Sequence, residues 1–296
     1  SIFDFLMPQY LFNYHYFQKQ YENDIVKNND EEKTKQLKKL VTPFILRRNK
    51  KEVLTELPDK IEQNIILPFN DEEEKLYVAN LAEVNKELQE LYDLEGSDKM
   101  QILKLLTRLR QLCLEPRLVY DNIDQPSSKL KACMELIKTM QENKQKVLLF
   151  SSFTSVLDLI AEECQKAGIT YYMLTGSTNK EDRRELVSRF QKDDTTVFLI
   201  SLKAGGTGLN LTSAEAVIHF DPWWNVSAQN QATDRAYRIG QKNNVQVFNL
   251  VMKDSVEEKI IELQKRKKEL ADMFVENNSG GLSQMSKEDI LSLFTM

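Results

Sequence analysis

Short apolar runs alternate with helical patterns through the second half of the chain, and this alternation limits the possible folds more than any other feature. The segments 155–168 (SVLDLIAEECQKAG) and 179–191 (NKEDRRELVSRFQ) have the apolar spacing of helices that pack on one side. The apolar runs, each of five to seven residues, are 146–150, 169–174, 196–200, 216–220 and 245–251. Parallel strands are joined by long crossovers that usually contain a helix. The alternation therefore predicts an α/β fold in which helices cover both faces of a parallel sheet.

The region before residue 123 has a different pattern and is expected to be mostly helical. Residues 71–92 begin with four acidic side chains, which suit a helix N-terminus, and residues 100–116 form a second amphipathic segment that ends at Pro116. One strand is expected at 60–69. The predicted regions are a helical region at 1–122, a polar linker at 123–128, an α/β lobe at 129–254, and a charged amphipathic helix with a C-terminal tail at 255–296.

Charge and composition exclude several classes of protein. The net charge of −5 argues against a large basic face, so contacts with phosphate groups must come from local clusters. No apolar run approaches the roughly 18 residues of a membrane span, and no membrane partner is expected. The three cysteines lack paired spacing, and with only two histidines they predict neither a zinc site nor a disulfide framework. The start of the sequence lacks the pattern of a signal peptide and an initiator methionine, so we expect an intracellular piece of a longer protein.

The segments that follow the predicted strands are the first places to search for a ligand site, because ligands of open parallel sheets bind beyond the carboxyl ends of the strands. SLKAGGTGLNLTSA follows the run at 196–200, and its three clustered glycines let the backbone approach a ligand closely. An ordinary strand-to-helix turn explains these glycines equally well. DPWWN follows the run at 216–220; we expect one tryptophan to pack in the core and the other to stack on a partner.

The segment QATDRAYRIGQ, at 231–241, carries two arginines in a chain that is slightly acidic. Gln231, Arg235 and Arg238 lie at i, i+4 and i+7, which on a helix places all three on one face. Two guanidinium groups side by side can bind phosphate oxygens and neutralise charge that develops at a γ-phosphate. A solvated helix with local Asp–Arg pairs is the alternative. The order of glycine segment, tryptophan turn and arginine pair favours a phosphate site.

These ordered motifs resemble those of a known family. KAGGTGLNLTSAEAVIHFDPWWN and QNQATDRAYRIGQ are similar to motifs V and VI of the SWI/SNF-type ATPases, which are helicase-like double-stranded-DNA translocases of helicase superfamily two. KVLLFSSFTSVLDLI resembles motif IV, and MLTGSTNKEDRRELVSRF resembles the segment that follows it in the second RecA-like lobe. FILRRNKKEVLTELPDKIE resembles the stretch between the two lobes, and SIFDFLMPQYL resembles the stretch after motif III. The resemblance covers nearly the whole chain. It implies a RecA-like parallel sheet sandwiched by helices, with helical protrusions before the lobe and a brace helix after it.

The resemblance also implies roles for individual residues. Arg235 and Arg238 match the motif VI arginines that reach the nucleotide phosphates from the second lobe, with Arg238 as the arginine finger. The positions implied at the ATP site are Gln231, Gly206, Thr207 and Gly208. The positions implied at the DNA backbone are Ser151, Ser152, Thr178, Lys203, Asn210 and Trp223. Contacts with the backbone rather than the bases suit a motor that does not read sequence.

A complete nucleotide motor needs parts that the motifs of this chain do not supply. It needs a phosphate-binding loop of the G-x-x-x-x-G-K-[ST] type and acidic residues that hold Mg²⁺. No glycine in this sequence is followed by lysine. We therefore expect a first RecA-like lobe upstream to hold most of the ATP and the Mg²⁺, and this chain alone to be inactive. We expect the strand at 60–69 to pair normally with the sheet of that lobe, and to be an unpaired or re-paired edge in this chain.

Three functions compete as interpretations of this sequence. The first is half of an ATP-driven motor on duplex DNA, with the upstream lobe as a partner and a DNA-bound protein as a further target. The second is a non-hydrolysing module that docks DNA or a protein, which would not need the arginines and glycines in this order. The third is an RNA helicase of the same superfamily, against which the DPWWN turn, the RIGQ ending and the long inter-lobe helices argue. The expected location is the cytoplasm or nucleoid of a bacterium, which the compact inter-lobe region favours, or the nucleus of a eukaryote.

Overall fold

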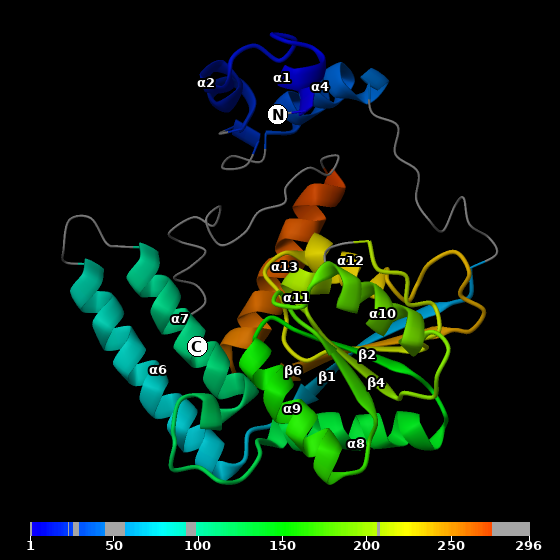
Figure 1. Ribbon diagram of the computed structural model, residues 1–296. Coiled ribbons are helices and arrows are strands. Elements are labelled where there is room, and N and C mark those ends of the chain that lie inside the picture. The colour runs from blue at the N-terminus through cyan, green and yellow to red at the C-terminus, as the bar shows by residue number, and fades with distance from the viewer. Residues whose placement is uncertain are drawn as a thin grey trace. The chain divides into compact units, whose positions relative to one another are not determined.

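The computed structural model describes residues 2–22, 24–25, 30–44, 57–92, 99–205 and 208–273 (Figure 1). The backbone forms two compact units, of which one contains residues 1–55 with 269–277 and the other contains 56–268 with 278–296. The tail predicted after the last helix lies outside the described residues. The predicted boundaries at 122, 128 and 254 stay predictions. No helix within the described ranges is both long enough and apolar enough to cross a membrane.

The first unit is built from short helical segments near the start of the chain. Asn13 begins one of them, because its side-chain oxygen accepts a hydrogen bond from the Tyr16 amide at 2.8 Å. Asp30 begins another by accepting from the Lys33 amide at 3.0 Å. The segments are α1 (Ile2–Leu6), α2 (Tyr14–Phe17), the π-helical turn η1 (Gln18–Glu22), α4 (Glu31–Val41) and the 3-10 turn η2 (Thr42–Phe44).

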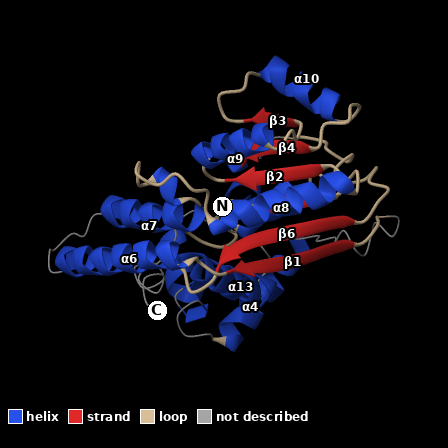
Figure 2. Cartoon of the chain, turned by 90° about the horizontal axis from the view of Figure 1, so that it is seen from below, coloured by secondary structure: helices blue, strands red, loops and turns tan. Residues whose placement is uncertain are grey.

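A six-stranded parallel sheet forms the centre of the second unit, as the alternating pattern predicts (Figure 2). Each of the five predicted apolar runs coincides with a strand to within two residues at either end, and the strand order is β1-β6-β5-β2-β4-β3. The four central strands have almost no exposed side chains, which is usual where helices cover both faces of a parallel sheet. The strands are β1 (Lys60–Leu67), β2 (Val147–Ser151), β3 (Tyr171–Leu174), β4 (Val197–Ser201), β5 (Ala216–His219) and β6 (Val245–Met252).

Helices cover both faces of this sheet, and each face has its own apolar core. On one face, α8 (Ser128–Glu142) and α9 (Thr154–Lys166) pack their apolar sides on alternate residues of the strands, such as Leu149 and Leu199 (Figure 2). On the other face, α10 (Lys180–Phe190), α11 (Leu202–Gly205) and α12 (Val226–Thr233) pack on the intervening residues, such as Phe150 and Phe198. The alternation of side chains along each strand thus supplies both cores.

The edge strand β1 is a re-paired edge, which is one of the two outcomes expected for this chain. It pairs with β6 in parallel over its whole length, from Lys60 with Val245 to Leu67 with Met252. Its pairing with the sheet of an upstream lobe in a longer protein stays a prediction. Most of its side chains are exposed or only half-buried, in contrast to those of the central strands. The strand therefore extends the sheet of this lobe and leaves its outer edge at the surface.

Two long helices, α6 (Asp71–Tyr92) and α7 (Lys99–Leu114), lie side by side in the second unit (Figures 1 and 2). The helix α6 begins at Asp71, because the side-chain oxygen of Asn70 accepts hydrogen bonds from two amides of the first turn at 3.0 and 2.9 Å. The helix α7 ends before Pro116, as predicted, and the 3-10 turn η3 (Pro116–Leu118) follows. Together with the start of α13 (Val256–Met273), the two helices form a third apolar core.

Candidate functional site

The segments predicted to bind DNA all follow strands of the sheet, and the parallel arrangement brings them to one edge. Ser151 and Ser152 stand at the end of β2, and Thr178 follows β3. Lys203 and Asn210 follow β4, and the DPWW turn follows β5. We call this edge, where β2, β3, β4 and β5 end, the carboxyl edge. The prediction that ligand-binding segments gather beyond one end of the strands agrees with this topology.

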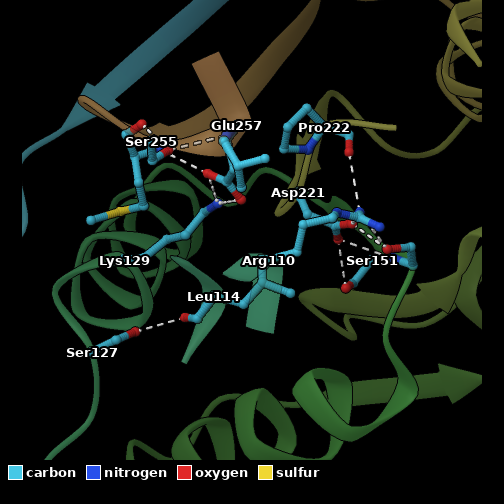
Figure 3. A network of polar contacts seen from close by, with 12 residues as sticks. Arg110, Leu114, Ser127, Lys129, Ser151, Asp221, Pro222, Ser255 and Glu257 are labelled. Carbon is cyan, nitrogen blue, oxygen red and sulfur yellow. Dashed lines mark hydrogen bonds and ion pairs between the residues drawn. The ribbon is translucent and has the colours of Figure 1, made fainter. Parts of the chain in front are cut away.

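A buried ionic network holds two of these segments together (Figure 3). Arg110 on α7 donates a hydrogen bond from Nη2 to Oδ2 of Asp221, in the turn after β5, at 2.8 Å. The same nitrogen donates to Oγ of Ser152 at 3.0 Å. Asp221 accepts from Oγ of Ser151 at 2.7 Å, from the Ser152 amide at 3.0 Å and from the Ser152 hydroxyl. The Arg110–Asp221 network therefore joins α7, the end of β2 and the turn after β5.

This network changes the interpretation of the two serines. Ser151 has no exposed surface, and its hydroxyl group also accepts from the Phe153 amide at 3.1 Å. A side-chain contact between Ser151 and a DNA backbone is therefore not compatible with this arrangement, and the sequence motif misled because the burial depends on Asp221, seventy positions away. Ser152 is half-buried and lies at the surface of the same network. Its predicted contact with DNA stays a prediction.

The sequence interpretation also missed Arg110, which is only 5% exposed. A detectable signal existed, because Arg110 lies between Leu106 and Cys113 at the i, i+4, i+7 spacing that defines the apolar side of α7. A charged residue at such a position is rarely buried unless it has a partner of opposite charge. Asp221, buried at 1% exposure, is that partner.

The two tryptophans of the DPWWN turn have different environments. Trp224 is 6% exposed and packs in the core that α6, α7 and α13 share, so one ring is in the core as predicted. Trp223 is half-buried and packs against two cores at once. Its amide donates to Oε1 of Gln229 at 3.2 Å, and its carbonyl oxygen accepts from the Gln264 side chain on α13. Stacking of Trp223 on a partner stays a prediction.

An open pocket of about 610 Å³ lies next to the segment after β4. Three cationic side chains of α10 line it, and sequence analysis did not single them out: Lys180, Arg183 and Arg184. Their signal in the sequence was the i, i+3, i+4 spacing, which places them on one side of a helix. Two predicted DNA-contacting residues, Thr178 and Asn210, line the same pocket. The structure thus brings two predicted positions together with three positive charges.

Hydrogen bonds fix the walls of this pocket. Asn179 begins α10 by accepting from the amides of Glu181 and Asp182 at 3.0 and 2.8 Å. Arg183 donates from Nη1 to the carbonyl oxygen of Ala204 at 3.2 Å, which ties α10 to α11. Lys203, the neighbour of Ala204, is exposed. An exposed lysine beside a cationic pocket suits contact with phosphate groups.

The predicted common helix face for Gln231, Arg235 and Arg238 is wrong. The helix α12 ends at Thr233, and both arginines lie in the turns that follow it. The main chain leaves the helical pattern at Arg235, because its amide donates to the carbonyl oxygen of Ala232, three residues back, at 3.1 Å. The carbonyl oxygen of Arg235 accepts from the Leu211 amide at 3.0 Å, which ties the turn to the segment after β4. The turns end at Gly240, whose φ of +101° favours glycine.

The two arginines also differ in environment. Arg235 is 7% exposed, and its Nε donates to the carbonyl oxygen of Gly205 at 3.0 Å. Burial lowers the pKa of the Arg235 guanidinium, and the nearby Arg238 cation lowers it further. Arg238 and Gln231 are exposed. Arg235 therefore connects the arginine turn to the glycine segment, and Arg238 is open to a ligand.

The glycine segment is partly described. Gly206 and Thr207 lie outside the described residues, and Gly208 is exposed with a φ of +41°. Gly205 is buried, and a Cβ atom there would come within 3.1 Å of the Phe150 ring, so a larger residue would displace that ring. Among the described residues, no group of histidine, cysteine or acidic side chains could hold a metal ion. The arginines suit phosphate oxygens, and the described donor set does not itself suit Mg²⁺.

The fold and the site define a class of protein before any comparison: a RecA-like α/β lobe with cationic groups beyond the carboxyl edge of its sheet. Residues 128–240 match the helicase conserved C-terminal domain, and residues 1–118 match the SNF2-related domain. The chain belongs to the SWI/SNF (SNF2-related) family and contains its helicase-like C-terminal domain, as its motifs indicated.

Individual relatives agree with this assignment. An uncharacterized ATP-dependent helicase of Mycoplasma pneumoniae is 37% identical over 99% of this chain, which covers 28% of that protein. The ISWI chromatin-remodeling complex ATPase ISW1 of Saccharomyces cerevisiae is 32% identical over 99% of this chain, which again covers 28% of it. The chain thus spans less than a third of the length of these two relatives.

A solved structure shares the fold. The Sulfolobus solfataricus SWI2/SNF2 ATPase core in complex with dsDNA superimposes with a TM-score of 0.65 at 31% identity, over 98% of this chain and 62% of that chain. The RecA-like fold predicted from the motifs is therefore confirmed. The roles of the individual site residues, and of the helix α13 as a brace, stay predictions.

Proposed function

We propose that this chain is the C-terminal half of an ATP-dependent double-stranded-DNA translocase. It supplies an arginine finger to a nucleotide that a preceding lobe holds, and it contacts the DNA backbone with its carboxyl edge. The observation that carries the proposal is the double link between the arginine turn and the glycine segment. Arg235 donates from its side chain to Gly205 and accepts at its carbonyl oxygen from Leu211. Gly208, Leu209 and Asn210, which lie between these two contacts in the sequence, line the cationic pocket, so the same segment connects the proposed nucleotide and DNA sides.

The arginines have distinct tasks in this proposal. Arg238 is exposed, so its guanidinium group can reach a phosphate that develops charge during hydrolysis. Arg235 is buried and holds the turn that presents Arg238, while Gln231 is exposed one turn earlier in the chain. An arginine finger contributes about 10³–10⁵ in rate when the phosphates and the metal are already in place.

The nucleotide itself requires a second binding surface. The described residues offer cations for phosphate oxygens and no acidic cluster for Mg²⁺. Mg²⁺, when bound, neutralises charge on the β- and γ-phosphate oxygens. We assign that ion and the phosphate-binding loop to the preceding lobe, and we expect the chain alone to bind DNA without hydrolysing ATP.

The DNA side of the proposal depends on charge rather than on base recognition. Lys203, Lys180 and Arg184 are exposed around the pocket that Thr178 and Asn210 also line. Cations and hydroxyl or amide groups in this combination bind phosphate oxygens of the backbone and carry no sequence information. Trp223 and Ser152 extend the same edge toward the turn after β5.

The arginine-finger role is tested in the longer protein that contains the preceding lobe. Arg238→Lys keeps the positive charge but loses the planar fork that binds two oxygens, so kcat should fall by about 10³ or more while KM for ATP changes little. Arg108→Lys is the matched control, because Arg108 is half-exposed on α7 and pairs with Glu83 at 3.5 Å. An unchanged kcat in the Arg238→Lys protein would contradict the assignment.

A further inference from the structure

Arg110 is a buried cation on α7 whose partners lie outside the helical pair α6–α7. It projects from α7 toward the turn after β5, and only 5% of its surface is exposed. Its Nη2 donates to Asp221, to Ser152 and, at 3.4 Å, to the carbonyl oxygen of Pro222 (Figure 3). Burying a guanidinium group is unfavourable unless its donors are used. Here the partners come from two loops that are far apart in the sequence.

Aromatic rings complete the environment of this guanidinium group. Its central carbon lies 5.0 Å from the centre of the Phe153 ring, 5.2 Å from that of Trp224 and 5.7 Å from that of Trp223. Phe153 belongs to the loop after β2, and the tryptophans belong to the turn after β5. Cation–π contacts therefore add to the hydrogen bonds in setting the positions of the same two loops.

Asp221 connects Arg110 to the main chain at the end of β2. Its Oδ1 accepts from the Ser151 hydroxyl and the Ser152 amide, and its Oδ2 accepts from Arg110. The carboxylate thus fixes the main chain at the end of β2 as well as the turn that carries it. Arg110 is buried, so it does not itself reach a DNA backbone at the surface. Its contacts orient the residues that do.

We propose that Arg110 is a positioning residue that couples the helical pair α6–α7 to the DNA-facing loops after β2 and β5. The inference rests on the proposed function, because it assigns DNA contact to these loops. A displacement of α7 would move both loops together through the Arg110–Asp221 network. Binding of duplex DNA at the loops would, in the same way, be transmitted to the helical pair.

The chain carries a built-in reporter for this coupling. It has two tryptophans, and both rings lie against Arg110. Tryptophan emission therefore reports on the network itself. The experiment titrates the full chain with a fluorescent duplex and follows anisotropy and tryptophan emission together, at several salt concentrations. The variants are Arg110→Lys, the double variant Arg110→Met/Asp221→Asn, and the control Arg108→Lys.

Positioning and direct phosphate contact predict different salt dependence. Arg110→Lys should weaken duplex binding about tenfold and remove the DNA-induced change in emission. The slope of log K against log[salt] should stay at the wild-type value, because the residues that Arg110 positions, Ser152 and Trp223, are neutral and release no counterions. A slope reduced by about 1 would show that Arg110 itself neutralises a phosphate and would overturn the proposal.

The double variant Arg110→Met/Asp221→Asn distinguishes the positioning of the two loops by Arg110 from its neutralisation of the Asp221 charge. It leaves no buried carboxylate without a partner, so it should fold and melt like the wild type even if Arg110→Lys does not. We expect it to bind DNA as weakly as Arg110→Lys, because the guanidinium nitrogen Nη2 that contacts both loops is lost. Binding at wild-type affinity would overturn the proposal. A wild-type chain that does not bind the duplex at all would instead contradict the proposed function, and with it the DNA-facing part of this inference.

Discussion

Single cations around the open pocket set the electrostatic part of the proposed DNA contact. Lys203 and Arg184 are both exposed beside the residues that line it. The slope of log K against log[salt] is negative, and each of Lys203→Gln and Arg184→Gln should make it less steep by about 0.9, because binding then releases one counterion fewer from the duplex. Fluorescence anisotropy with one duplex at several salt concentrations measures this slope. Lys131→Gln is the control, because Lys131 is exposed on α8 at the opposite face of the sheet.

The buried His219 makes the stability of the lobe depend on pH. Its Nε2 lies 2.9 Å from the Thr233 hydroxyl, and burial lowers its pKa to about 4 from an ordinary value of 6.5. The unfolded chain therefore takes up a proton near pH 6.5 that the folded chain does not accept until about pH 4. This contribution to stability is complete above pH 6.5 and is lost as the pH falls from 6.5 toward 4.

Urea unfolding at pH 7 and pH 5 measures this effect. From the two pKa values, the wild-type chain should lose about 2 kcal/mol more than His219→Asn does between these pH values. The comparison with the variant removes the contribution of carboxylates that titrate in the same range. An equal loss in both proteins would contradict the assignment of the effect to His219.

At the scale of elements, a buried ion pair joins α8 to the start of α13. Lys129 donates to both carboxylate oxygens of Glu257 at 2.6 and 2.7 Å, and neither side chain has more than 1% exposure (Figure 3). Glu257 also accepts from the Met252 amide at 2.8 Å, so the pair holds the end of β6 in place. Burial raises the pKa of the Glu257 carboxyl, and Lys129 opposes that shift.

Breaking this pair from one side should be costly. Lys129→Met leaves a buried carboxylate without its cation and should lower the free energy of unfolding by about 3–5 kcal/mol. Lys129→Met/Glu257→Gln removes both charges and keeps an acceptor for the Met252 amide, so it should recover most of that loss. Urea unfolding of the two variants gives the comparison. A double variant as unstable as the single one would show that packing, rather than the stranded charge, causes the loss.

The elements that sequence analysis predicted well are those with strong local patterns. The apolar runs at 146–150 and 196–200 became central strands, and Pro116 ended α7 as expected. The partner of β1 was not predictable in this way, because a parallel strand finds its neighbour through side chains distant in sequence. Local pattern fixes the type of an element, whereas its neighbours depend on the rest of the fold.

The candidate site shows the same limit more sharply. The residue types and their order predicted the segments beyond the carboxyl edge, which the topology brings together. The spacing of Arg235 and Arg238 suggested a helix face, but α12 ends before them, and the turn at Arg235 is bonded to Leu211, a residue distant in the sequence. Ser151 matched a motif for DNA contact but is buried against Asp221, and Arg110 belongs to no motif, although its place on the apolar side of α7 indicated burial. Such contacts between distant segments are not encoded in a spacing rule.

At the scale of the molecule, the proposed function assigns to this chain one half of what an ATP-driven motor requires. The contacts of Arg235 join its arginine turn to the segment after β4, and part of that segment lines the cationic pocket. The chain spans 28% of the relatives in Mycoplasma pneumoniae and Saccharomyces cerevisiae, so those proteins contain much that this chain does not. We therefore propose that the phosphate-binding loop and the Mg²⁺ ligands lie in a preceding lobe.

The measurement that tests this account most directly is ATP hydrolysis by the chain alone, with and without duplex DNA, compared with hydrolysis by the longer protein that includes the preceding lobe. The account predicts no turnover by the chain alone under either condition and DNA-stimulated turnover by the longer protein. Absence of ATP turnover in both the chain alone and the longer protein would favour a module that docks DNA or a protein without hydrolysis. Turnover by the chain alone that Arg238→Ala abolishes would contradict the central claim, because it would place a complete phosphate site within these 296 residues.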